Sequence, residues 1–255
     1  EAGLRTQDPG RPFPEELNRR MADALCRYHF APTAGARDNL LRENISPEHI
    51  VVTGNTAVDA LCYAAAQPWT FADPRLEALG RDRDLILVTA HRRESFGPPF
   101  AEICRALRAV AEENPGVEIA YPVHPNPNVL EAARTLLGGC DRIHLLEPLE
   151  YLPFVHLMKK SRLILTDSGG IQEEAPSLGI PVLVLRDVTE RPEAVAAGTA
   201  RVIGTKHDSI VTAVRELLHD AGARASMVRG ENPFGDGRAG ERIADYLMKQ
   251  ESLNP

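Results

Sequence analysis

Residues 163–174 read Leu-Ile-Leu-Thr-Asp-Ser-Gly-Gly-Ile-Gln-Glu-Glu, and this stretch decides the predicted fold. A short apolar run before polar residues and glycines is typical of a buried parallel strand that turns tightly into a helix. The glycines let the backbone approach a ligand closely, and free N–H groups at a helix start attract phosphate. The pattern is neither GxGxxG nor a Walker loop, so neither dinucleotide nor P-loop chemistry follows. The simpler alternative is a structural turn in which Ser168 or Asp167 caps the helix.

The alternation of strand and helix continues on both sides of this stretch. Segments with apolar residues at helical spacing separate short apolar runs, which is the pattern of βαβ units in a doubly wound α/β domain with a parallel sheet. We therefore predict one complete domain of this kind from residue 84 to about residue 226. The further apolar runs that predict its strands are 85–88, 117–123, 143–146, 181–185 and 201–203.

The first part of the chain is less complete. Helices are predicted over 17–28 and 33–43, and a lone strand over 50–53. Three elements bury little apolar surface, so this part makes a poor core by itself. Residues 67–83 are predicted to form a linker.

Composition excludes several classes of protein. The 255 residues include 29 Lys and Arg against 36 Asp and Glu, a net charge of −7, which does not favour nucleic acid or an anionic membrane surface as partner. No apolar run approaches the roughly 18 residues of a membrane helix. The four cysteines include no CxxC pair, so we expect buried, reduced thiols in a cytoplasmic protein rather than structural zinc.

Polar residues follow three other predicted strands. His91, Arg92 and Arg93 come after the first strand of the domain, His124 after the second, and Arg191 after the run 181–185. In open parallel sheets the ligand crevice lies at the carboxyl ends of the strands, so these side chains favour an anion site. The alternatives are a solvated basic loop, a structural histidine, and a surface ion pair of Arg191 with a neighbouring glutamate.

Acidic residues complete this reading. Glu174 lies about one turn into the helix after the glycines and is placed to accept the two hydroxyls of a ribose. Glu15 and Glu16 follow prolines at a predicted helix start, where they could simply be partners of the helix dipole. Together the strand ends predict a nucleotide or nucleotide-sugar site and leave the reaction open.

Six motifs resemble one known family. In chain order they run over residues 1–6, 14–16, 54–56, 91–97, 167–179 and 189–194. They are similar to those of the non-hydrolysing UDP-N-acetylglucosamine 2-epimerases of bacteria, and the agreement runs over essentially the whole chain. The resemblance implies a GT-B-like α/β fold, with two Rossmann-like domains facing a cleft.

The resemblance also assigns the domains. Residues 1–66 would be the C-terminal part of the first Rossmann-like domain, 67–83 the linker and 84–234 the UDP-binding domain. Residues 235–255 would form a C-terminal helix that packs back on the first domain.

The activity implied is the reversible conversion of UDP-N-acetylglucosamine to UDP-N-acetylmannosamine. The family eliminates UDP to leave 2-acetamidoglucal and adds it back with the opposite configuration at C2, which supplies amino sugars for cell-surface polysaccharide. No cofactor is implied, neither a metal nor a nicotinamide. The expected partners are UDP-N-acetylglucosamine and UDP, with no nucleic acid and no membrane, and the intact enzyme is expected to be a cytoplasmic homodimer.

Residue roles carried over from the family fall into two groups. Glu1 and Glu15 match the acids that remove and return the C2 proton, and His91 would donate to the departing diphosphate. Glu174 would hold the ribose, Leu149 and Phe154 the uracil, and His124 and Arg92 match positions linked in some members to an activating substrate molecule. The remaining predicted substrate-binding residues are Arg19, Ser168, Gly169, Gly170 and Arg191.

The chain departs from the family pattern in one large respect. The part before Glu1 would carry a Gly-Thr-Arg-Pro-Glu loop and a catalytic aspartate. We therefore expect this chain alone to be inactive, with Leu17, Leu25, Leu40 and residues 51–52 uncovered. The alternatives are a GT-B glycosyltransferase and a UDP-binding fragment without activity.

Overall fold

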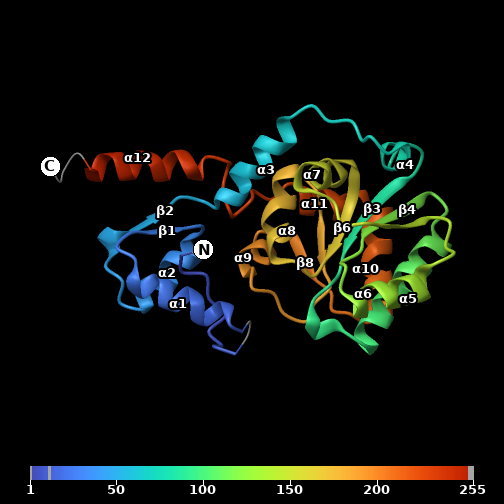
Figure 1. The fold of residues 1–255 in the computed structure, drawn as a ribbon, viewed down its shortest axis with the longest axis horizontal. Helices are drawn as coiled ribbons and strands as arrows, with labels where there is room; N and C mark the ends of the chain where they lie inside the picture. Colours follow the sequence, from blue (N-terminus) through green and yellow to red (C-terminus); the bar gives the residue numbers. More distant parts are fainter. Residues whose placement is uncertain (1, 11–12, 252–255) are drawn as a thin grey trace. The chain divides into compact units, whose positions relative to one another are not determined.

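The computed structural model describes residues 2–10 and 13–251. These residues belong to two compact units (Figure 1). One unit contains residues 1–63 and 232–255, and the other contains residues 64–231. Among the described residues, no helix is both long enough and apolar enough to cross a membrane.

The larger unit is built on a six-stranded parallel sheet of order β5-β4-β3-β6-β7-β8. Its first strand in the chain, β3, lies in the middle, so the strand order reverses between β3 and β6. That reversal is the position where open α/β sheets bind ligands. The strands are β3 Asp84–Thr89, β4 Val117–Pro122, β5 Ile143–Leu146, β6 Ser161–Thr166, β7 Val182–Val184 and β8 Ala200–Val202.

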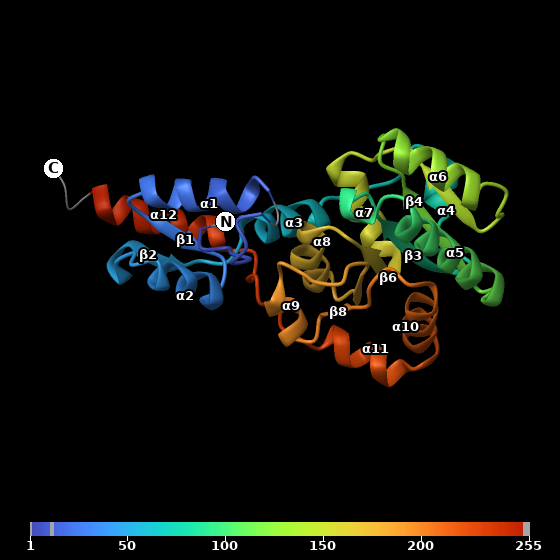
Figure 2. The same ribbon diagram turned by 90° about the horizontal axis from the view of Figure 1, so that it is seen from below.

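Helices cover this sheet and bury its apolar residues. Three of them, α5 (Pro98–Glu113), α6 (Pro127–Leu137) and α10 (His207–His219), pack together over one hydrophobic core (Figure 2). The helix α7 (Tyr151–Lys160) packs on β3 and β6. The remaining elements are α4 Pro74–Ala78, η2 Arg93–Ser95, α8 Gly169–Glu174, η3 Ala175–Leu178, α9 Pro192–Ala196 and α11 Ala221–Val228.

The smaller unit contains a two-stranded parallel sheet in which β1 pairs with β2. Its last helix, α12, returns to this sheet from the far end of the chain. The Tyr246 ring of α12 packs edge-on against Tyr28 at 5.4 Å and Phe30 at 5.7 Å between ring centroids. The elements of the unit are α1 Glu15–Leu25, β1 His29–Ala31, α2 Ala34–Arg42, η1 Pro47–His49, β2 Ile50–Val52, α12 Ala239–Glu251 and most of α3 Thr56–Ala66, whose last residues, 64–66, belong to the larger unit.

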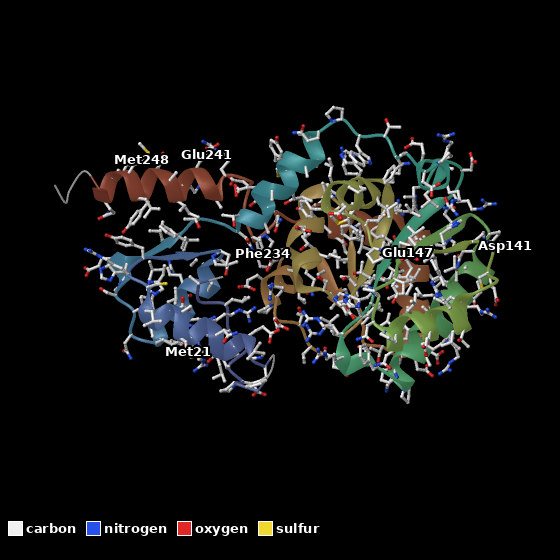
Figure 3. The ribbon with its side chains drawn as sticks, viewed as in Figure 1. Met21, Asp141, Glu147, Phe234, Glu241 and Met248 are labelled. Atoms are coloured by element: carbon white, nitrogen blue, oxygen red, sulfur yellow. The ribbon has the colours of Figure 1, made fainter. Side chains whose placement is uncertain are left out.

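The smaller unit also corrects several expectations. Sequence patterns missed the strand β1, whose residues His29–Ala31 form no apolar run and become a strand through pairing with β2, and they also missed the helix α3. Leu40 was expected to be uncovered but is fully buried between α2 and the sheet. Leu17 and Leu25 are exposed as expected, and Met21, on the same helix face, is also exposed (Figure 3).

Two further expectations concern other parts of the chain. The thiols of Cys26 and Cys62 are exposed, so the expectation of buried cysteines is wrong for these two and holds for Cys104. Residues 67–83, predicted as a linker, contain the short helix α4, where Lys160 of α7 donates from Nζ to the carbonyl oxygen of Glu77 at 2.6 Å.

The segment before α12 makes a close backbone contact with the loop after β2. The N–H of Asn55 donates to the carbonyl oxygen of Phe234 at 2.7 Å. Gly235 has φ +121°, and a Cβ placed there would lie 3.1 Å from the Cα of Gly54. Only glycine fits this position without strain.

We predict that Gly235→Ala destabilises the smaller unit by about 2 kcal/mol, because it adds both strain and a clash. Gly240→Ala is the matched control, since a Cβ there meets nothing within 4 Å and alanine favours a helix. Amide hydrogen exchange of α12 should accelerate in the first variant and slow slightly in the second. Equal exchange in both would contradict the role of the glycine contact.

Candidate functional site

Four polar loops leave the carboxyl ends of neighbouring strands in the larger unit. They comprise residues 90–93 after β3, 123–126 after β4, 167–170 after β6 and 185–191 after β7. Because the strands are parallel and adjacent in the sheet, the loops gather at one edge of it. This edge includes the point where the strand order reverses, the expected ligand position in such folds.

Short hydrogen bonds tie the loops after β3 and β6 together. The hydroxyls of Thr89 and Thr166 share a hydrogen bond of 2.7 Å, and both residues are buried. The N–H of Asp167 donates to the carbonyl oxygen of Thr89 at 3.1 Å, which extends the strand pairing by one residue. The N–H of Ser168 donates to Thr166 Oγ1 at 2.9 Å. The start of the glycine loop is therefore fixed to the sheet.

Asp167 joins the same two loops through its side chain. The carboxylate is fully buried, and its Oδ2 accepts the backbone N–H groups of His91 at 2.6 Å and Arg92 at 2.7 Å. The helix N-cap is Ser168, which makes no side-chain cap hydrogen bond. The capping alternative is therefore confirmed for Ser168 as the N-cap residue, although its side chain makes no capping hydrogen bond, and it is wrong for Asp167.

His91 and His124 lie face to face. Their rings stack with centroids 5.3 Å apart and planes 10° apart, which brings the loops after β3 and β4 together. Burial lowers the pKa of His91, the carboxylate of Asp167 raises it, and charge on His124 and Arg92 lowers it, with a net decrease. Two histidines and an arginine at one sheet edge suit an anionic ligand, whose charge would offset their mutual repulsion.

The glycine loop is held from behind by side chains. Arg191 is buried and pairs with Glu173, and its Nη1 also lies 3.7 Å from Oε2 of Glu190. The alternative of an ion pair with a neighbouring glutamate is therefore confirmed for Glu190, but this pair is buried and does not lie on the surface. A Cβ at Gly169 would lie 3.2 Å from Cζ of Arg191, so the guanidinium lies directly against the loop. Gln172 Nε2 donates to the carbonyl oxygen of Ser168 at 3.0 Å, and the Thr189 hydroxyl donates to Gln172 Oε1 at 2.5 Å.

Glu174 differs from its buried neighbour Glu173. Its Oε1 accepts the hydroxyl of Tyr151 on α7 at 3.0 Å. Burial raises the pKa of Glu174 to about 7, the Tyr151 hydrogen bond opposes this rise, and the charge of Glu173 adds to it. The two residues predicted to bind uracil, Leu149 and Phe154, are half-buried just before and within α7.

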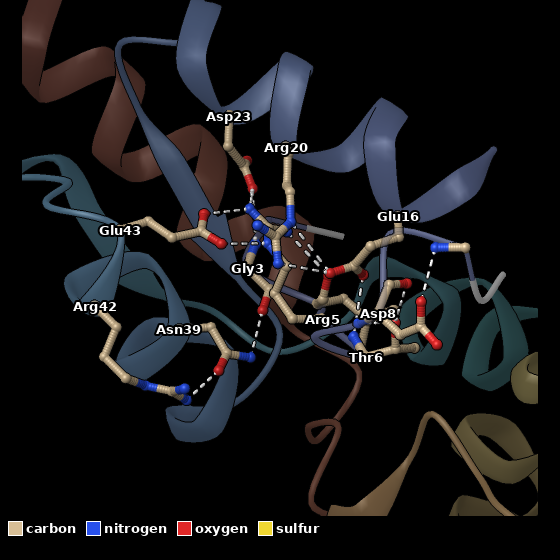
Figure 4. A network of polar contacts seen from close by, with 12 residues as sticks. Gly3, Arg5, Thr6, Asp8, Glu16, Arg20, Asp23, Asn39, Arg42 and Glu43 are labelled. Carbon is tan, nitrogen blue, oxygen red and sulfur yellow. Dashed lines mark hydrogen bonds and ion pairs between the residues drawn. The ribbon is translucent and has the colours of Figure 1, made fainter. Parts of the chain in front are cut away.

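The other predicted residues belong to the smaller unit. Glu15 is exposed at the first position of α1, and Arg19 is half-buried one turn later on the same helix. Glu16 is fully buried and its Oε2 accepts the N–H of Thr6 at 3.0 Å (Figure 4). Glu1 lies outside the described residues.

A buried ion network holds the segment that follows Glu1. Arg5 pairs through Nη2 with Asp23 of α1 at 2.6 Å and with Glu43 at the end of α2 at 2.7 Å (Figure 4). Asn39 Nδ2 donates to the carbonyl oxygen of Gly3 at 2.8 Å. Residues 3–6 are therefore fixed against both helices.

Sequence reasoning missed the functional position of several residues. It treated Asp167 only as a helix cap, and it did not select Tyr151, Gln172 or Glu173. A short-range signal existed for Gln172, which is four residues after Ser168 in a helix. The contacts of Asp167 and Tyr151 span 76 and 23 residues and follow only from the sheet order.

Comparison with known proteins decides the family. The profile of the UDP-N-acetylglucosamine 2-epimerase family matches residues 1–248. The chain belongs to this family. It is 53% identical over 253 residues to UDP-N-acetylglucosamine 2-epimerase of Salmonella typhimurium, covering 97% of this chain and 67% of that protein. It is 50% identical over 248 residues to the Bacillus subtilis protein of the same name, covering 97% and 64%.

Solved structures of epimerases share the fold. The S. aureus MnaA–UDP co-structure is 47% identical with a TM-score of 0.94, covering 99% of this chain and 68% of that one. The Neisseria meningitidis UDP-GlcNAc 2-epimerase bound to UDP-GlcNAc is 45% identical with a TM-score of 0.91, covering 98% and 68%. These relatives confirm both the predicted family and the predicted GT-B class. The chain spans about two thirds of the length of the epimerases it matches.

A more distant likeness concerns the fold alone. The wall teichoic acid polymerase TagF is 14% identical with a TM-score of 0.57. Architecture by itself therefore does not separate an epimerase from a polymerase, and the function has to be argued from the site.

The adjacent residues Glu15 and Glu16 allow a test of their different burial, since Glu16 is buried and hydrogen-bonded whereas Glu15 is exposed. Glu16→Gln should lower stability by about 1–3 kcal/mol, because the amide cannot accept from both Thr6 and Arg20 and leaves a buried polar group unpaired. Glu15→Gln, at an exposed position, should change stability by less than about 0.5 kcal/mol. Thermal unfolding of both variants measures the difference in stability. Equal unfolding midpoints would contradict the structural role of Glu16 as the hydrogen-bond acceptor for Thr6 and Arg20.

Proposed function

We propose that the protein interconverts UDP-N-acetylglucosamine and UDP-N-acetylmannosamine by eliminating UDP and adding it back with inversion at C2. Membership of the family and the gathering of four polar strand-end loops at the sheet reversal carry this proposal. The product would supply amino sugars for cell-surface polysaccharide. The homodimer and the cytoplasmic location expected from the resemblance stay predictions.

The larger unit supplies the groups proposed to bind UDP. The N–H groups of Ser168, Gly169 and Gly170 would receive the diphosphate at the start of α8, and buried Arg191 keeps this loop in place. Glu174 would accept the ribose hydroxyls, and Leu149 and Phe154 would contact the uracil. No step in this scheme requires a metal or a nicotinamide.

Charge changes during the reaction explain the roles of the other groups. Departure of UDP builds negative charge on the diphosphate, and a donor at His91 stabilises that charge more in the transition state than in the substrate. A base must remove the C2 proton and an acid must return one on the opposite face. We propose Glu15 and Glu1 for these steps, and Arg19, one turn from Glu15, for contact with the substrate.

We further propose that the 255-residue chain by itself binds uridine nucleotides without turning over the substrate. The sheet of the smaller unit has two strands, an arrangement that is marginal in isolation, and Val52 of β2 is 43% exposed.

Deuterium incorporation at C2 of UDP-N-acetylglucosamine in heavy water tests both proposals. The chain should be assayed alone and with a polypeptide that supplies the remaining third of its relatives. Exchange and a second set of anomeric proton signals should appear only in the complemented sample. Absence of both from that sample would overturn the epimerase assignment, and full exchange by the chain alone would overturn the requirement for complementation.

The raised pKa of Glu174 predicts pH-dependent binding. A carboxylate accepts both ribose hydroxyls through charge-assisted hydrogen bonds, whereas the protonated acid loses the charge and turns one oxygen into a donor, so affinity through Glu174 should fall as the pH decreases through about 7. From about pH 8 to about pH 6, loss of the Glu174 carboxylate should raise the dissociation constant for UDP-N-acetylglucosamine roughly tenfold. The effect is measured as the difference between the native chain and Glu174→Gln, because protonation of His91 acts in the opposite direction and is common to both. This ligand suits calorimetry because its phosphates do not titrate in that range.

Glu174→Gln is the control for this pH effect. At high pH the variant should bind UDP-N-acetylglucosamine more weakly than the native chain does. Its affinity should also lack the part of the pH dependence that titration of Glu174 causes. If the native chain and the variant respond to pH in parallel, Glu174 does not contact the ribose.

A further inference from the structure

The carboxylate of Asp167 is placed to act on a side chain as well as on the backbone. It is fully buried at the point where the strand order reverses, between the loops after β3 and β6. Its Oδ2 is occupied by two short bonds from the N–H groups of His91 and Arg92. These two donors compensate the charge at that oxygen and fix the orientation of the carboxyl group.

The other oxygen, Oδ1, is buried and has no hydrogen-bond partner among the described residues. The ring of His91 lies beside this oxygen, with Nδ1 3.4 Å from Oδ1. A small rotation of the ring would complete the bond. A carboxylate only accepts hydrogen bonds, so the group that satisfies it must be an N–H.

The remaining neighbours of His91 carry positive charge or become positive. The ring of His124, from the loop after β4, stacks on one face of His91, and Arg92 follows it in the chain. Burial, His124 and Arg92 all disfavour the charged imidazolium, and Asp167 is the negative group that favours it.

We propose that Asp167 is a positioning residue that holds a proton on Nδ1 of His91 and so leaves Nε2 as the nitrogen available to an anionic ligand. The identity of that ligand as the diphosphate of UDP rests on the proposed function. The orientation of the ring and the location of its proton rest on the contacts of Asp167 alone.

One consequence concerns the form of His91 that acts. With Nδ1–H directed at Asp167, the neutral ring has only a lone pair at Nε2, and that lone pair repels a phosphate oxygen. Only the imidazolium can donate from Nε2 to the diphosphate. With Asp167 in this position, the ligand therefore binds to protonated His91. No proton has to move between the ring nitrogens before the diphosphate departs.

Asp167→Asn separates this role from a purely structural one. The amide oxygen can still accept from the N–H groups of His91 and Arg92, so the loops stay joined. The amide NH2 then faces Nδ1 and requires a lone pair there, which moves the proton of the neutral ring to Nε2. Loss of the negative charge should also lower the pKa of His91 by about one unit or more.

Nitrogen-15 NMR of the histidine rings in the full chain measures both effects. The His91 signals are assigned by their loss in His91→Asn. The native chain should show the Nδ1–H tautomer and Asp167→Asn the Nε2–H tautomer with a lower pKa. Asp141→Asn, an exposed aspartate on the same unit, should change neither. An Nε2–H tautomer in the native chain, or an unchanged tautomer in a folded Asp167→Asn, would overturn the proposal.

Two further measurements on the native chain, the tautomer of His91 and its response to UDP, decide the remaining cases. If Asp167→Asn does not fold, the tautomer of the native chain alone decides, with Nδ1–H supporting the proposal and Nε2–H overturning it. Addition of UDP tests the proposed function separately, because a diphosphate at Nε2 should raise the pKa of His91. An Nδ1–H tautomer with no response to UDP would keep the positioning role and reject the nucleotide site.

Discussion

The parallel pairing of β3 with β6 is the constraint on which the candidate site depends. These strands are 72 or more residues apart in the chain, yet their ends carry Thr89 and Thr166 as register partners. Beyond this pair the two loops stay joined, because the buried carboxylate of Asp167 accepts the N–H groups of His91 and Arg92. A shift of register by one residue would direct Asp167 away from the loop after β3 and would break its bonds to His91 and Arg92. The location of the site is thus a consequence of strand pairing.

Two pairs of adjacent glutamates, Glu15 with Glu16 and Glu173 with Glu174, have different surroundings within each pair. Glu16 and Glu173 are buried and bind structural partners, whereas Glu15 is exposed and Glu174 faces Tyr151. Successive residues in a helix point about 100° apart, so one carboxylate can hold a loop while the next remains available to a ligand. Glu16 holds the segment around Thr6, and Glu173 holds Arg191 behind the glycine loop. The exposed or half-buried glutamate beside each of them is the one proposed to contact the substrate.

In the smaller unit, a buried ion pair network around Arg5 holds the segment that follows Glu1. Arg5 is fully buried and pairs with carboxylates from two helices, so the segment after Glu1 is fixed without a large sheet beneath it. Removing one partner of such a group is costly because a charge is left unpaired in the interior. Ion pairing therefore replaces part of the apolar packing that a larger sheet would give to this segment.

The sequence by itself determined the α/β class, the strand ends that carry polar residues and the family, because apolar runs, glycine turns and motif order are local properties. It also identified His91 and the glycine loop as the core of a candidate phosphate site. It did not reveal β1, the burial of Leu40, or the partners of Asp167 and Arg191. Those depend on contacts between distant segments, and only the order and register of the strands decide which distant residues meet.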